Sequence, residues 1–250
     1  MSTPITRVPM MMPGTAPRFH GAGLTHRGLV RDRNEDSILT DPSGMLWAVA
    51  DGMGGYGHGD VASDIVIDKL SHIADDTLAP QALRTQLYAA NAEILARTQH
   101  GNQMGSTVVA VLVQNATATI AWVGDCRAYL LRGPALRLLT RDHTVVQDMV
   151  DQGLLGDAER ENHPERHVVT RAVGVEHTLD IDTTITPLIA GDRILLCSDG
   201  LTTCLGDQEI AGLLGASPTP EGTCNLLVRA ALEAGAPDNV SVVVAFASER

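Results

Sequence analysis

Short apolar runs separated by turns fill most of the chain. Their lengths and their Val, Ile and Thr content predict β-strands, and several of the runs end at Gly or Asp. These runs are Met45–Ala50, Thr107–Val113, Thr117–Val123, Ala128–Leu131, Arg193–Cys197 and Val240–Phe246. The residues Gln114, Asn115 and Ala116 between two of them predict a hairpin turn. Asp180–Thr186 alternates in part, as a half-exposed strand does.

Other segments carry apolar residues at helical spacing. Such stripes predict helices over Asp60–Asp75 and Pro80–Thr98, a shorter one over Thr144–Gln152, and one from Cys224 to Leu232 that stops at Gly235. Strands and helices do not alternate strictly, so a parallel doubly wound sheet is disfavoured. The order favours an α+β fold with mainly antiparallel sheets.

The length of 250 residues fits a single large domain. We expect a flexible tail over residues 1–18, which hold four prolines and no apolar core of a signal peptide, and a folded domain over 19–250. The segment 151–167 is polar and predicts an exposed insertion, taken as about 148–172. No apolar stretch reaches the ~20 residues of a membrane span, so no membrane association is expected.

Charge and cysteine content narrow the function classes. A formal net charge of −12 argues against a nucleic-acid binder, and it also repels phosphate unless local cations reverse the field. The four cysteines form no C-x-x-C pair, which favours free thiols in a reducing cytoplasm.

Four aspartates stand where apolar strands begin or end. Asp51, Asp125 and Asp199 follow such runs, and Asp238 comes just before one. Each alone is a common turn residue. If they converge, they cannot all stay ionised without cations, because like charges raise one another's pKa. Ligands made of carboxylate and carbonyl oxygens suit Mg²⁺ or Mn²⁺, and zinc spacings are lacking.

Six motifs follow one another along the chain: Arg31-Asp32-Arg33-Asn34-Glu35-Asp36, Asp51-Gly52-Met53-Gly54-Gly55, Gly105-Ser106-Thr107, Gly124-Asp125-Cys126-Arg127, Ser198-Asp199-Gly200-Leu201 and Asp238-Asn239-Val240. In this order they resemble the motifs of the PPM family, the metal-dependent 2C-type serine/threonine protein phosphatases, in their compact bacterial branch. The resemblance covers about residues 20–247. It implies an αββα sandwich of two central antiparallel sheets with helices outside, and a mobile flap over about 148–172.

The resemblance also implies a role for each motif residue. Asp51 would bridge two core Mn²⁺ or Mg²⁺ ions, and the Gly52 carbonyl would bind one of them. Asp199 and Asp238 would hold the other ion. Asp36, with Glu35 as a second candidate, would support the site, and Asp125 with Asp199 would hold a third, weaker ion.

The substrate phosphate requires a cation of the protein as well. The R-x-x-N-E-D spacing implies Arg31 for this role, and Arg33 is the competing candidate. The activity implied is direct hydrolysis of phosphoserine or phosphothreonine by a water that the metals activate. The partners implied are phosphorylated proteins, either kinases or their substrates. The chain is expected to act as a monomer in the cytoplasm.

One position departs from the family pattern. Eukaryotic members carry a histidine, proposed as general acid, where this chain has Met53. A metal-bound water, His58 or His167 remain the alternatives. Two other functions also stay open: hydrolysis of a small phosphoester, and a non-catalytic regulatory module on the same fold.

Overall fold

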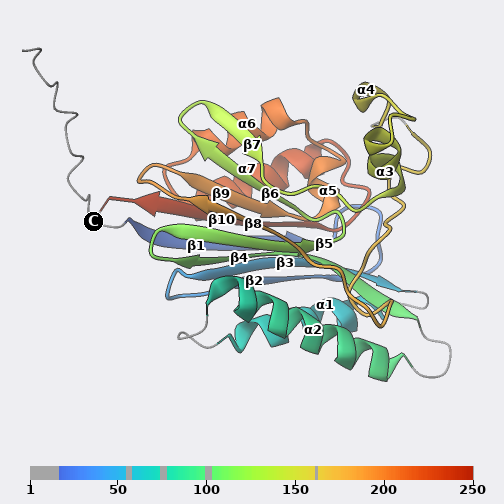
Figure 1. The fold of residues 1–250 in the computed structure, drawn as a ribbon. Coiled ribbons are helices and arrows are strands. Elements are labelled where there is room, and N and C mark those ends of the chain that lie inside the picture. Colours follow the sequence, from blue (N-terminus) through green and yellow to red (C-terminus); the bar gives the residue numbers. More distant parts are fainter. Residues whose placement is uncertain (1–16, 55–57, 74–77, 99–102, 161–162, 250) are drawn as a thin grey trace, which may run out of the picture.

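Two five-stranded sheets lie face to face, with helices covering both outer faces (Figure 1). The computed structural model describes residues 17–54, 58–73, 78–98, 103–160 and 163–249. Every strand pairing within the two sheets is antiparallel. The predicted α+β class and the αββα layering are therefore confirmed.

The strands of the two sheets come from both halves of the chain. The first sheet has the order β1 (Arg18–His26), β10 (Val240–Ser248), β9 (Arg193–Cys197), β6 (Arg127–Arg132) and β7 (Ala135–Leu138). The second has the order β2 (Asp36–Thr40), β3 (Leu46–Gly54), β4 (Met104–Gln114), β5 (Thr117–Val123) and β8 (Asp182–Pro187).

Helices cover the outside of each sheet and one end of the sandwich (Figure 1). The second sheet is covered by α1 (Gly59–Ser71) and α2 (Ala79–Arg97), and the first by α5 (Asp199–Thr202), α6 (Asp207–Ala216) and α7 (Pro220–Glu233). The helices α3 (Val145–Asp151) and α4 (Asp157–Arg160) lie at the end of the sandwich.

Burial on both faces explains the continuous apolar runs of the central strands. In β4, Val108 and Ala110 pack toward α1 and α2, whereas Val109 and Val111 pack between the sheets. The strand period of two sends neighbours to opposite faces, and here both faces are core. In β3 the same period turns Val49 toward the opposite sheet. Asp51 lies two residues further along on the same face, at the edge of the apolar layer between the sheets.

The β4–β5 hairpin is tighter than the sequence predicts. Gln114 belongs to β4 and pairs with Thr117, so the loop is only Asn115 and Ala116. Both have positive φ, 51° and 55°, as in a type I′ turn, whose twist matches that of the strands.

The predicted helices are confirmed with small shifts at their ends. The helix expected over 60–75 ends at Ser71, and residues 74 and 75 lie outside the described residues. The helix expected at 144–152 is α3, where the Thr144 side chain accepts a hydrogen bond from the Gln147 N–H as an N-cap. The C-terminal stripe belongs to α7, and Gly235 follows its end with a φ of 105°.

Six elements are not anticipated by the sequence patterns: β1, β2, β7, α4, α5 and α6. β1 begins at Arg18, the last residue assigned to the flexible tail, and residues 1–16 lie outside the described part of the chain. The segment 148–172 contains the C-terminal part of α3 and all of α4. An antiparallel β-bridge between Thr144 and Val169 closes its base. Its mobility stays a prediction. None of the described helices combines the length and apolar character needed to cross a membrane.

Candidate metal centre

The strand-end aspartates converge on one cavity of about 1170 Å³. Asp51 and Asp125 reach it from the ends of β3 and β5, Asp199 from the start of α5 directly after β9, and Asp238 from the loop before β10. The two sheets thus each contribute carboxylates. Arg31 and Gly52 line the same cavity, so the sequence motifs meet in space.

Asp36 lies behind this cavity rather than in its lining. It stands opposite Asp51 in the β2–β3 register and is 7% exposed. The Ser198 hydroxyl donates to Asp36 Oδ2 at 2.9 Å. Asp36 Oδ1 is buried and has no hydrogen-bond partner among the described residues. A buried carboxylate oxygen without a donor favours a cation or a proton nearby.

The carboxylates raise one another's pKa. Burial first, and then the charges of Asp199 and Asp238, raise the pKa of Asp36 to about 7, and the nearby hydroxyls of Ser241 and Ser198 oppose this rise. Burial and then the Asp36 and Asp199 charges raise the pKa of Asp51 well above its usual range. Burial and the Asp199 charge do the same for Asp125. Divalent cations would relieve this repulsion.

Gly52 is required by the close approach of three chain segments. A Cβ on Gly52 would lie 2.1 Å from the Gly59 carbonyl oxygen and 2.5 Å from that of Glu35. Its N–H donates to the Glu35 carbonyl at 3.1 Å. The absent side chain leaves the backbone free to approach the cavity.

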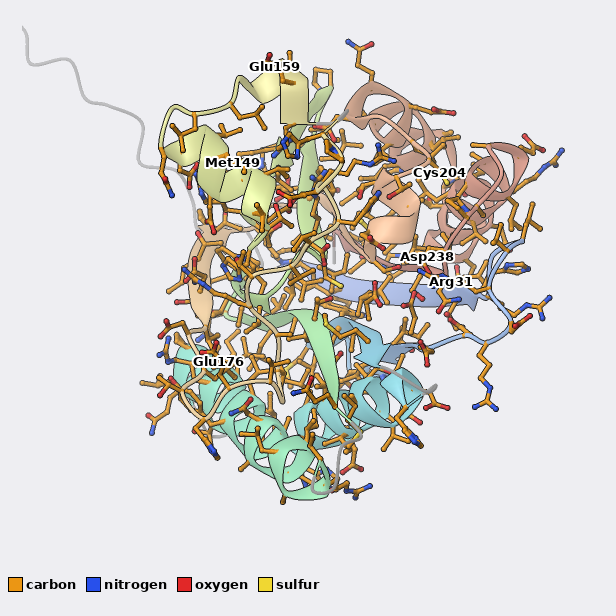
Figure 2. All side chains as sticks on the ribbon, turned by 90° about the vertical axis from the view of Figure 1, so that its right-hand side faces the viewer. Arg31, Met149, Glu159, Glu176, Cys204 and Asp238 are labelled. Atoms are coloured by element: carbon orange, nitrogen blue, oxygen red, sulfur yellow. The ribbon has the colours of Figure 1, made fainter. Side chains whose placement is uncertain are left out.

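Arg31 lies against a predicted metal ligand. Its Nε donates to Asp238 Oδ1 at 2.8 Å and its Nη2 to Oδ2 at 2.7 Å. Figure 2 shows Arg31 and Asp238 side by side at the end of the sandwich that lies on the right in Figure 1. Arg33, the competing candidate for the phosphate, also lines the cavity.

Asn239 organises the loop that carries both arginines, a role that the sequence motifs did not indicate. Its Oδ1 accepts the Glu35 N–H at 2.8 Å. Its Nδ2 donates to the carbonyls of Arg27 and Arg33, each at 2.8 Å. One side chain thus fixes residues 27–35 beside the cavity. Its place next to Asp238 was the only signal in the sequence.

The two candidate histidines differ in position. His167 lines the cavity, and its Nδ1 is 3.7 Å from Asp199 Oδ2. His58 precedes α1 and is not among the described residues that line the cavity, whereas Met53 is.

The residues fit a hard divalent cation. The donors are carboxylate oxygens and a backbone carbonyl, the orphaned Asp36 Oδ1 lies close behind them, and their mutual repulsion needs a positive partner. Within the described ranges no three acidic, histidine or cysteine side chains stand in finished ligand geometry. Both oxygens of Asp238 are engaged by Arg31 instead.

Cys126 is not placed to act as a nucleophile toward phosphate. Cys126 and Arg132 have the C-x5-R spacing used by enzymes that form phosphocysteine. Cys126 is 1% exposed, however, and burial raises the pKa of its thiol well above the usual range. Arg132 pairs with Asp192 at 2.7 Å rather than with the thiol.

A sequence model described as Protein phosphatase 2C matches residues 21–225, most of the chain. The chain belongs to the protein phosphatase 2C family. The serine/threonine protein phosphatase PstP of Mycobacterium tuberculosis is 39% identical over 230 residues, which are 90% of this chain. The chain spans only 44% of PstP's length. The serine/threonine phosphatase Stp of Listeria monocytogenes is 34% identical over 239 residues, covering 90% of this chain and 95% of Stp.

Solved structures of the family superpose closely on the fold. The M. tuberculosis PstP crystal structure has a TM-score of 0.87 at 37% identity, covering 92% of this chain and 99% of the other. The catalytic domain of PstP in complex with two manganese ions has a TM-score of 0.83 at 36% identity, with coverages of 92% and 98%.

Proposed function

We propose that the chain is a metal-dependent protein serine/threonine phosphatase of the 2C type. The observation that carries this function is the convergence of Asp51, Asp125, Asp199 and Asp238 on one cavity beside Arg31. The manganese complex of PstP and the names of the relatives support it.

The carboxylates divide into ligands and supports. Asp51 and the Gly52 carbonyl would hold one Mn²⁺ or Mg²⁺ ion, and Asp51, Asp199 and Asp238 would hold a second. Asp125 with Asp199 would hold a third ion. Asp36 supports the site from behind, where Ser198 fixes its Oδ2 at 2.9 Å. When bound, the metals supply a water of lowered pKa and positive charge beside the phosphoryl oxygens.

Arg31 positions the phosphate. Its guanidinium already makes a two-point contact with the carboxylate of Asp238, and a phosphate presents a similar pair of oxygens. The contact with Asp238 first, and then the charges of Asp199 and Asp51, raise the pKa of Arg31. The guanidinium therefore stays charged next to the proposed metal ligands. Residues 27–35, held by Asn239, keep the arginine at the rim while the phosphoryl group transfers to water.

Of the two candidate histidines, His167 is better placed than His58 to donate a proton to the leaving oxygen. It lines the cavity, whereas Met53 at the family position carries no proton to give. It belongs to the segment 148–172, which we propose covers the bound peptide as a flap.

The relatives and the free thiols support a proposal for the biological setting. We propose that the chain opposes a serine/threonine kinase in the cytoplasm of a bacterium. The four cysteines are free, as a reducing compartment favours. All proposed ligands come from one chain, so a monomer has a complete site.

Phosphate release from a phosphothreonine peptide tests the function. We expect hydrolysis with Mn²⁺ that EDTA abolishes and that falls at least about 100-fold in Asp51→Asn, the loss of one charged group in the site. The control is Asp68→Asn, an exposed aspartate of α1, which should keep wild-type activity. Small aryl and sugar phosphates tested in parallel address the small-phosphoester alternative. Peptide hydrolysis that is slower than metabolite hydrolysis, or independent of metal, would contradict the proposal.

A further inference from the structure

His143 holds both backbone groups of the residue that precedes Asp125. The Gly124 N–H donates to His143 Nδ1 at 3.0 Å, and the Gly124 carbonyl accepts the His143 N–H at 2.9 Å. Gly124 has a φ of 103°, and a Cβ there would lie 2.4 Å from the Thr107 Cβ. The turn that presents Asp125 therefore needs glycine and is fixed by one other residue.

The opposite edge of the ring is fixed as well. Because Nδ1 accepts a hydrogen bond, the ring proton belongs on Nε2, which is 3.3 Å from Asp182 Oδ2. Arg171 Nη1 lies 3.4 Å from the Nε2 and 3.4 Å from Asp182 Oδ1. Burial and the Arg171 charge lower the pKa of His143, against the pull of Asp182 and Asp142, which keeps the acceptor lone pair of Nδ1 available.

Packing prevents the ring from turning. His143 is 5% exposed and stacks on Trp122, with ring centroids 6.2 Å apart and planes 20° from parallel. The Trp122 indole N–H donates to the Arg141 carbonyl at 2.8 Å. The His143 carbonyl accepts the Thr170 N–H at 2.8 Å, at the base of the segment 148–172. One residue therefore joins the Asp125 turn to that segment.

We propose that His143 is a positioning residue that presents the Asp125 carboxylate to the weakest metal site through the Nδ1 contact with Gly124. The inference rests on the proposed function, because that function gives Asp125 its metal. A residue that only fills the core would stabilise the fold without this contact. The two roles predict different results for substitutions that keep opposite edges of the ring.

A matched pair of variants separates the two edges. In His143→Asn the amide oxygen takes the place of Nδ1 and can accept from Gly124, whereas in His143→Gln the amide reaches the place of Nε2 and Asp182. Mn²⁺ titrations followed by the paramagnetic resonance of free Mn²⁺ measure each class of site. We expect His143→Gln to weaken the weakest class about tenfold, as loss of a residue that orients a ligand does, and His143→Asn to stay near wild type. Asp125→Asn gives the reference for complete loss of that class.

A second readout is independent of metal. Amide exchange at Gly124, measured on the metal-free protein, should be faster in His143→Gln than in wild type or His143→Asn. If the Gln variant does not fold, Asp182→Ala replaces it. The Asp182 side chain is 44% exposed, and its removal takes away the acceptor that faces the Nε2 proton of His143. The affinity of the weakest site should therefore fall, but by a smaller factor than in His143→Gln.

Unchanged weak-site affinity in His143→Gln, equal losses in the Asn and Gln variants, or no weak site in wild type would each overturn the inference. The wild-type peptide assay keeps the two proposals apart. If the wild type is active and the His143 variants keep its weak-site affinity, only the role of His143 is contradicted. If the wild type is inactive, the proposed function is contradicted.

Discussion

At the scale of a single residue, burial changes the protonation of Asp36. Its Oδ2 is held by Ser198, its Oδ1 has no partner among the described atoms, and its pKa is raised to about 7. The pKa values of Asp51 and Asp125 are raised in the same direction. The folded chain without metal therefore binds protons that the unfolded chain, with carboxyl pKa values of about 4, releases.

This difference predicts how the metal-free protein responds to pH. The stabilisation is fully present below about pH 4 and is lost as the pH rises through about 7, because the folded state then binds more protons than the unfolded state. With EDTA present, thermal unfolding should occur at steadily lower temperature between pH 5 and pH 8, and Mn²⁺ at pH 8 should reverse the loss. Asp36→Asn should flatten the dependence. A melting temperature that rises over this interval would contradict the assignment.

At the same scale, the sequence predicted the acidic residues but few of their supports. Asp51, Asp125, Asp199 and Asp238 are recognisable because each adjoins a buried strand. Ser198, Asn239 and His143 act through hydrogen bonds to segments far away in the chain, such as Asn239 to Arg27. Such pairings depend on the folded arrangement, and no local pattern encodes them.

At the scale of elements, the strands that the sequence missed are all at sheet edges. β1 and β7 are the outer strands of the first sheet, and β2 is an outer strand of the second. Central strands such as β4 are buried on both faces and show a continuous apolar run, whereas edge strands are partly exposed and short or rich in glycine and histidine. α5 has four residues, too few for a helical stripe.

The loop between β1 and β2 provides the test at this scale. Asn239→Ala removes three hydrogen bonds to residues 27–35 and leaves their backbone groups without this partner, so the free energy of unfolding should fall by about 2 kcal/mol. The value of kcat/KM for a phosphothreonine peptide should fall too, because Arg31 lies in this loop. Urea titration and initial rates measure the two effects.

The matched control is Asn225→Ala in α7. This exposed asparagine donates one hydrogen bond, to the Glu221 carbonyl, and its loss should change stability by less than about 0.5 kcal/mol. If Asn239→Ala unfolds at the wild-type urea concentration with unaltered rates, the loop does not depend on Asn239.

At the scale of the whole molecule, the metal centre lies where the two sheets meet. Asp51 belongs to one sheet, and Asp199 and Asp238 adjoin strands of the other, so bound cations would join the halves of the sandwich. They would also offset part of the net charge of −12 where phosphate must approach. The layering itself came from the family resemblance, because element order alone indicated only antiparallel sheets.

Anomalous diffraction from crystals grown with Mn²⁺ tests the central claim most directly, because it locates the ions. The account predicts two strong manganese peaks about 3.5–4 Å apart in the cavity, bridged by Asp51 and bonded by the Gly52 carbonyl, Asp199 and Asp238. A cavity without manganese at saturating concentration, or ions held by other side chains while Asp51 stays unbound, would contradict it.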